Sequence, residues 1–287
     1  MELGYLLQQT MFGISIGLTF SMISIGFSIT FGLSRIINLA HGAFYALGAY
    51  FIFSAMMVFN NYAFSLLIAV AGVGLISFFV ERTIVRGLYG KDIDLSLITT
   101  FSILLVASTL IRVVWGLDPK SISPPASLNV QISTGSFVFP AYYVFLAACS
   151  AAIFIIVWII INKTMLGRII KAGSEDKERV ETLGINMGRV FTINYIFGSM
   201  LAAVGGGLMA PLMSIEPSMG SRIVLLCFAV VVVGGMGSIF GTMLAGIIIG
   251  LSISYVTILS PPMAEATAFL VMAVFLLLRP KGLLGTG

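Results

Sequence analysis

The sequence predicts an all-α protein, a polytopic transmembrane helical bundle with about eight or nine membrane segments. Hydrophobic residues make up 59% of the 287 residues and charged residues only 9%, whereas a typical soluble domain has roughly 25% charged residues. Mean hydropathy is +1.11, and apolar runs recur that are too long for the core helices of a soluble protein. The longest of these runs is interrupted by a glycine-rich break, Gly234–Gly241.

Each apolar run predicts at least one membrane span. The runs cover residues 12–33, 39–59, 64–80, 95–115, 142–161, 190–213, 223–259 and 266–278. The tract 223–259 is too long for one ordinary span, so we expect it to reverse at Gly234–Gly241, either as a re-entrant half-helix or as a tight turn between two spans. No polar stretch is long enough for a second core, which predicts a single membrane domain over residues 1–287.

Basic residues predict the orientation, because loops on the cytoplasmic side of a membrane carry an excess of Lys and Arg. They gather after the first, third, fifth and last runs, whereas the loops around residues 60, 116–139 and 214–220 contain few. The N-terminus is therefore expected outside and the C-terminus in the cytoplasm. The basic residues do not form one face, so nucleic acid binding is not indicated. The loop 116–139 is expected to be an ordered or partly extended surface loop.

Small residues inside the runs predict close helix packing. The pairs Gly13–Gly17 and Gly246–Gly250 have the GxxxG spacing, which lets two helix backbones approach one another. Cys149 and Cys227 both lie inside apolar runs, where buried small apolar side chains are favoured over a disulfide.

The most polar stretch, residues 167–189, is expected to be a cytoplasmic segment that binds a partner. Ser174 has the residue type of an N-cap, and Glu175 and Asp176 would follow in the first turn, where the helix dipole favours acids. Gly184 suits the left-handed position that ends a helix. These features predict a short helix from Glu175 to Leu183 whose charges require water or a protein surface.

Catalytic and metal-binding patterns are absent from the sequence. It contains no nucleophile elbow, HExxH motif, paired-carboxylate constellation or phosphate-cradling loop. His41 is the single histidine, so no metal site is predicted, and any nucleotide would be handled by another chain. Asn38 is placed to cap the second span and His41 to lie in its first turn, with packing favoured over a role in transport. The candidates for a pathway through the membrane are Asn38, His41, Gly234, Gly235, Gly237 and Ser238.

Six short motifs together carry a resemblance to a known family. They are INLAHG at 37–42, ER at 81–82, MLGR at 165–168, LGIN at 183–186, VVGGMGSIFGTMLAG at 232–246 and RPKGLLG at 279–285. In this order and spacing, the chain resembles the first of the two permease subunits in bacterial ABC importers for branched-chain amino acids. Urea and short-amide importers share this permease type. Ala43 departs from the pattern, because many relatives carry Glu after the His-Gly pair.

The resemblance implies a set of partners in the bacterial inner membrane. A second homologous permease would form a heterodimer with this chain, two cytoplasmic ATPases would bind ATP and Mg, and an extracytoplasmic substrate-binding protein would deliver the substrate. No cofactor would be bound by this chain itself. Two other interpretations stay open at this point: an ion-driven secondary transporter, which the lack of an acid in mid-span disfavours, and a membrane-embedded enzyme, for which no catalytic group is visible.

The resemblance also implies two docking sites. The helix 175–183 would be the coupling helix that enters a groove of the ATPase, with apolar residues in the groove and charged residues at its rim. The apolar residues are Val180, Leu183 and Ile185, and the rim residues are Glu175, Asp176, Glu178 and Arg179. Glu216 and Arg222, together with the loop 116–139, would face the substrate-binding protein.

Overall fold

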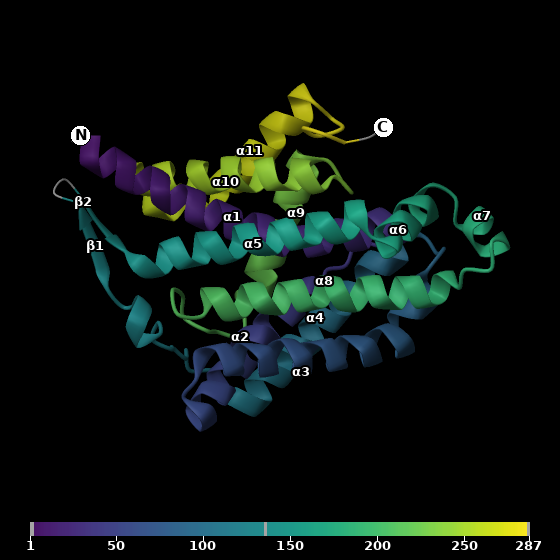
Figure 1. Ribbon diagram of the computed structural model, residues 1–287, viewed down its shortest axis with the longest axis horizontal. Helices are drawn as coiled ribbons and strands as arrows, with labels where there is room; N and C mark the ends of the chain where they lie inside the picture. Colours follow the sequence, from purple (N-terminus) through teal and green to yellow (C-terminus); the bar gives the residue numbers. More distant parts are fainter. Residues whose placement is uncertain (1–2, 135–136, 286–287) are drawn as a thin grey trace. The chain divides into compact units, whose positions relative to one another are not determined.

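The computed structural model describes residues 3–134 and 137–285, and most of this chain is helical (Figure 1). The helices are α1 (Leu3–Ser34), α2 (His41–Phe59), α3 (Tyr62–Thr83), η1 (Val85–Leu88), α4 (Ile93–Trp115), η2 (Ala126–Leu128), α5 (Ala141–Lys163), α6 (Met165–Glu175), α7 (Lys177–Thr182), α8 (Met187–Met209), α9 (Met219–Gly234), α10 (Ile239–Leu259), η3 (Pro261–Met263) and α11 (Ala264–Leu278). Two strands, β1 (Gln131–Thr134) and β2 (Phe137–Pro140), form an antiparallel hairpin.

Eight helical segments in the described part of the chain are long and apolar enough to cross a membrane. Most follow the predicted runs to within a few residues, but α1 begins at Leu3, nine residues before the run 12–33. The helix α9 is a further, shorter apolar helix. This confirms the all-α, polytopic prediction with eight or nine segments. The loop 116–139 carries η2 and the hairpin, which confirms a partly extended structure.

Polar side chains at the helix starts explain where three of the spans begin. Asn61 accepts a hydrogen bond from the Phe64 amide at 3.0 Å and so caps α3. Asn186 caps α8 and Ser238 caps α10 in the same way. Such caps satisfy amide groups that have no partner inside the helix, and unsatisfied amides are costly near a bilayer.

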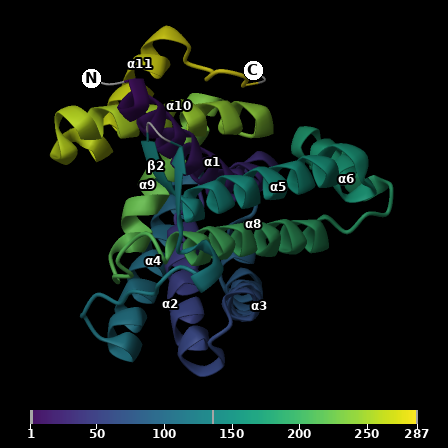
Figure 2. The same ribbon diagram turned by 60° about the vertical axis from the view of Figure 1, so that its left-hand side comes forward.

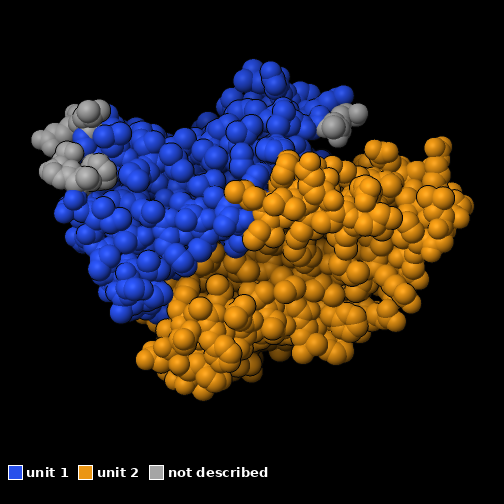
Figure 3. Space-filling view, in the orientation of Figure 1, with its two compact units in different colours: residues 1–25, 122–154, 225–287 blue, residues 26–121, 155–224 orange. Residues whose placement is uncertain are grey.

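The chain folds into two compact units, coloured separately in Figure 3. Unit 1 comprises residues 1–25, 122–154 and 225–287, and unit 2 comprises residues 26–121 and 155–224. The backbone passes from one unit to the other at four points, within α1, after residue 121, within α5 and within α9. A single membrane domain over residues 1–287 stays a prediction.

Unit 2 is built around α2, α3 and α8, which pack on one another. Figure 1 shows α3 running beside α8, and Figure 2 shows α3 nearly end-on below α8. The Tyr62 hydroxyl at the start of α3 donates a hydrogen bond to the Gly207 carbonyl of α8 at 2.9 Å. Large aromatic residues such as Tyr45 and Tyr50 are fully buried in this core.

Unit 1 brings the two GxxxG pairs against each other. Gly17 of α1 lies against the backbone of Gly246 and Ile247 in α10, and Gly250 lies against Gly13 and Gly17. This confirms the predicted packing role and adds that the two pairs are partners. The two cysteines are free thiols, with Cys227 buried.

Candidate functional site

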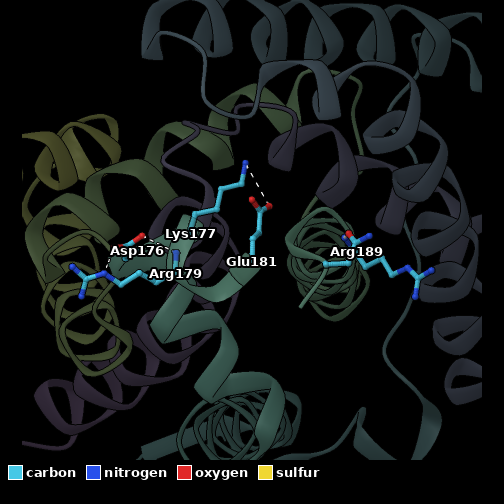
Figure 4. A network of polar contacts seen from close by, with 6 residues as sticks. Asp176, Lys177, Arg179, Glu181 and Arg189 are labelled. Carbon is cyan, nitrogen blue, oxygen red and sulfur yellow. Dashed lines mark hydrogen bonds and ion pairs between the residues drawn. The ribbon is translucent and has the colours of Figure 1, made fainter. Parts of the chain in front are cut away.

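The polar segment 167–189 folds as two helices rather than one. Thr164 caps α6, its hydroxyl accepting from the Gly167 amide at 3.3 Å. Asp176 then breaks the helix in an extended conformation, with φ −151° and ψ 95°. Its carboxylate caps α7 by accepting from the Arg179 amide at 3.1 Å and also pairs with the Arg179 guanidinium at 2.7 Å. Figure 4 shows this pair beside the second ion pair of α7, Lys177 with Glu181.

The prediction of Ser174 as the N-cap was wrong. Ser174 lies inside α6, and its hydroxyl donates to the Lys171 carbonyl at 2.7 Å. Glu175 ends α6 instead of opening the next helix, and Asp176 holds the capping position because its shorter acid side chain reaches the Arg179 amide. The left-handed conformation predicted for Gly184 is confirmed by its φ of 81°.

The apolar residues of α7 and the turn after it divide into inward-facing and outward-facing side chains. Val180 is 4% exposed, so it packs within this chain and is not presented to a partner, which corrects its placement in an ATPase groove. Leu183 is 78% exposed, and Ile185 is half-buried. Leu183 is the one large apolar side chain of the fully described segment 167–189 that is exposed, and its docking role stays a prediction. Leu183 therefore remains the strongest candidate on this segment.

The segment between α1 and α2 does not follow the predicted capping scheme. The N-cap position of α2 is Ala40, without a side-chain hydrogen bond, so Asn38 does not cap this helix. The Asn38 side chain instead accepts a long hydrogen bond from the Tyr195 hydroxyl of α8, at 3.5 Å. Thr100 of α4 holds the extended segment, because its hydroxyl donates to the Ile37 carbonyl at 2.8 Å and lies 3.1 Å from the Leu39 amide.

The contacts of His41 show that α2 starts beside an interior turn of α1 and not beside its end. The His41 ring is fully buried, lies against Phe27 and approaches Gly26. Gly26 precedes the end of α1 by eight residues, which corresponds to roughly 12 Å along a helix. The segment after Arg35 therefore returns along α1 before α2 begins, instead of simply joining two spans at the membrane surface.

The starts of α2 and α9 touch each other. A Cβ added at Gly220, the second residue of α9, would lie 2.5 Å from the carbonyl oxygen of Gly42. Since Gly42 is also the second residue of its helix, the first turns of two helices meet here through bare backbone. The start of α9 therefore lies beside the start of α2, which is itself set back from the end of α1.

The glycine-rich break lies at the end of α9, just before a full-length span. Gly235 and Gly237 have φ of 96° and 86° and form the turn, and Ser238 caps α10 by accepting from the Gly241 amide at 3.1 Å. The last carbonyls of α9 are satisfied by the tail after α11, since Leu283 and Leu284 donate to Val233 and Gly234 at 2.8 and 3.1 Å. The break is thus an ordered, hydrogen-bonded turn after a helix shorter than the candidate spans, and both the re-entrant and the two-span interpretations stay predictions. A pathway role for Gly234, Gly235, Gly237 and Ser238 stays a prediction.

Two loops expected on the outer side are joined in unit 2. Lys120 and Ile215 exchange backbone hydrogen bonds of 2.9 and 2.8 Å, which makes an isolated antiparallel bridge between the loops. Beside it, the Arg222 guanidinium and the Glu216 carboxylate form an ion pair of 2.7 Å, partly exposed on both sides. The sequence placed Glu216 and Arg222 in the same docking site but gave no sign that they are partners.

Comparisons with known proteins agree with these features. The model of the family "Branched-chain amino acid transport system / permease component" matches residues 9–278. The high-affinity branched-chain amino acid transport system permease protein LivH of Escherichia coli K12 is 30% identical, with 98% of this chain and 96% of LivH covered. BraD of Pseudomonas aeruginosa, with the same description, is 28% identical, with 99% and 97% covered. The structure of PsaBC from Streptococcus pneumoniae in complex with Fab has the same fold, with a TM-score of 0.50, 14% identity and 96% and 90% coverage.

Proposed function

Because the chain belongs to the permease-component family of branched-chain amino acid transport systems, we propose that it forms the membrane pathway for branched-chain or other small amino acids. It is a multi-pass permease subunit of an ABC importer. Permeases of this kind work with ATPase and binding-protein partners and are transporters rather than catalysts. LivH and BraD are both named as high-affinity branched-chain amino acid permeases, which favours these substrates over urea or short amides.

The observation that carries the coupling proposal is the exposure of Leu183. It follows a six-residue helix, α7, held between apolar spans by an Asp176 cap and two ion pairs. Exposed ion pairs contribute little free energy of binding, so a partner would gain most by burying Leu183. We assign this tip to a groove on a cytoplasmic ATPase, with the exposed acids Glu175 and Glu178 at the rim.

The complete importer would contain partners that supply what this chain lacks. In our proposal, a second homologous permease completes the pathway, and two cytoplasmic ATPases bind ATP and Mg. A substrate-binding protein docks on the loops joined by the Lys120–Ile215 bridge, close to the Glu216–Arg222 pair. The distribution of basic residues supports an inner-membrane orientation with the N-terminus outside and α7 and the C-terminus in the cytoplasm.

Leu183→Asp tests the coupling proposal in the importer reconstituted with all its subunits. The substitution places a charge where an apolar contact is expected, so uptake of radiolabelled leucine should fall at least tenfold while the ATPases keep their basal hydrolysis. Thr182→Asp is the matched control, because Thr182 is the exposed neighbour and receives the same charge. The control should retain most of the uptake. Normal uptake by Leu183→Asp would exclude this docking site.

The substrate proposal has a separate test. Unlabelled leucine, isoleucine and valine should compete with the labelled amino acid in the same vesicles, whereas urea and acetamide should not. Competition by urea alone would assign the chain to the urea and short-amide permeases and leave the coupling proposal intact.

A further inference from the structure

An acid is buried at the end of α3, next to the segment that leads into α4. The side chain of Glu81 is fully buried, and neither carboxylate oxygen has a hydrogen bond of good geometry in the described structure. Its neighbour Arg82 is exposed and makes no ion pair with it among the described contacts. Burying an acid is unfavourable unless its surroundings compensate, so the groups that face Glu81 indicate what it does.

One of these groups is Tyr89, in the turn after η1. Burial raises the pKa of the Tyr89 phenol, the Glu81 carboxylate raises it further by charge and by hydrogen bonding, and Arg86 opposes the shift. The phenol therefore stays protonated at physiological pH, so its hydroxyl can donate toward Glu81. Neither Glu81 oxygen has a complete hydrogen bond in the described structure, so the carboxylate can still accept from this donor.

The ring of Tyr89 extends this contact to α7. It stacks on Phe191, with ring centroids 4.5 Å apart and an angle of 26° between the planes. The Lys177 ammonium lies over the Phe191 ring, 5.7 Å from its centroid. Lys177 is the first residue of α7 and Phe191 lies one turn into α8, so one aromatic ring touches both α7 and Tyr89.

The same group reaches the start of α2. Tyr195, one turn after Phe191 in α8, is fully buried within electrostatic range of Glu81. Its hydroxyl lies 3.5 Å from the Asn38 side chain, and its ring packs edge-on against Phe44 of α2. Two sets of contacts in unit 2, Lys177–Phe191–Tyr89 and Tyr195–Asn38, thus lie on either side of the buried Glu81, whose charge acts on both Tyr89 and Tyr195.

We propose that Tyr89 is a positioning residue that transmits the movement of α7 to the Asn38–His41 segment, through its stack on Phe191 and its contact with Glu81. The proposal rests on the coupling function given above. Coupling needs two arrangements of one connected set of groups. The stack of Tyr89 on Phe191 can break and re-form when α7 moves. The Glu81 carboxylate, whose oxygens have no complete hydrogen bond in the described structure, can gain or lose the Tyr89 hydroxyl as a donor in the same movement.

The test measures a movement as well as transport. Cys149 and Cys227 are replaced by alanine, and Leu39→Cys is introduced in the Asn38–His41 segment as a reporter in the reconstituted importer, because the Leu39 side chain is half-buried and takes no part in these contacts. Its labelling rate with a small maleimide is compared with and without ATP and vanadate. In the reporter protein, we expect ATP and vanadate to change the labelling rate at least fivefold, within the usual range of coupling. In the Tyr89→Leu variant, we expect them to have no effect on this rate. Tyr89→Phe, which keeps the stack, should retain at least half of the change.

Transport by the cysteine-containing parent chain gives the second readout. Tyr89→Leu should lower leucine uptake per ATP hydrolysed at least fivefold, and the exposed variant Lys177→Gln should lower it in the same direction by less. Phe79→Leu is the control, because it breaks an exposed aromatic pair, Phe78 with Phe79, on α3 itself. It should leave the ratio unchanged.

Three outcomes would overturn the proposal. The first is an unchanged ratio in Tyr89→Leu when Leu183→Asp is uncoupled, which would leave the coupling function standing. The second is a loss of uptake and of ATP hydrolysis by the same factor in both Tyr89→Leu and Lys177→Gln, because residues needed only for folding would lower both activities together. The third is a Tyr89→Leu protein in which maleimide labelling at position 39 still responds to nucleotide.

Discussion

The contact between the starts of α2 and α9 gives a prediction whose size can be worked from the structure. In Gly220→Ala, the new methyl would lie 2.5 Å from the Gly42 carbonyl oxygen and 3.0 Å from its carbon. Both atoms are backbone, so they cannot rotate away. Overpacking costs about 1 to 3 kcal/mol, and contact this short falls at the upper end. A helix gains up to about 1 kcal/mol when Ala replaces Gly, so the net loss of stability should be about 1 to 2 kcal/mol.

Gly87→Ala is the matched control for this substitution. No atom lies within 4 Å of a Cβ at Gly87, and its φ is not positive, so alanine should be neutral or slightly stabilising. Thermal unfolding in detergent would then show a Tm for Gly220→Ala that is lower by roughly 2 to 8 °C, with no decrease for Gly87→Ala. An unchanged Tm for Gly220→Ala, or equal decreases in both proteins, would refute the reasoning.

Three further predictions concern the loops and caps. Glu216→Arg alone should lower the affinity for the binding protein, measured by surface plasmon resonance. The double variant Glu216→Arg with Arg222→Glu reverses the 2.7 Å pair and should restore this affinity if only the pair matters. A double variant that still binds weakly would assign the two charges to direct docking. Thr100→Val removes the hydroxyl that holds the 35–40 segment and should cost about 1 to 3 kcal/mol, seen as a lower Tm; an unchanged Tm would contradict this. Asp176→Ala should destabilise α7 by about 1 kcal/mol, so its amides should exchange faster by roughly fivefold, whereas unchanged exchange would show that Asp176 is not needed as a cap.

The spans were predictable because each one depends on a property of its own residues. A long apolar run flanked by basic or polar residues forms a membrane helix wherever it is placed, and the observed helices agree closely with the runs. The helix break at Gly234–Gly241 was predictable from its glycines. Its hydrogen bonding was not, because the last carbonyls of α9 accept from Leu283 and Leu284, which lie about fifty residues later in the chain.

The polar segment shows where local patterns mislead. Ser174 and Asp176 are both good N-cap residues, and the sequence alone favoured the earlier one. The amphipathic helix α6 continues through Ser174 because its apolar residues, such as Ile170, pack inside unit 2. Tertiary burial thus decided which residue became the cap, and it also turned Val180 inward while Leu183 stayed exposed.

The group around Glu81 was beyond prediction for a different reason. The ER motif at residues 81–82 was visible as a resemblance, but the charge on Glu gives no sign of burial. Only the packing of α3 against α8 brings Tyr89, Phe191 and Tyr195 to this acid. The partnership between Glu216 and Arg222 is of the same kind, since their six-residue separation matches no helical spacing.

Photocrosslinking from position 183 tests the central claim most directly. A benzophenone amino acid would replace Leu183 in the native membrane, and mass spectrometry would identify the chain captured after illumination. The account predicts a covalent product with a cytoplasmic ATPase that carries a nucleotide-binding motif, and a change in its yield when ATP and vanadate are added. Capture of lipid alone, or no ATPase product from a complex that still transports, would contradict it.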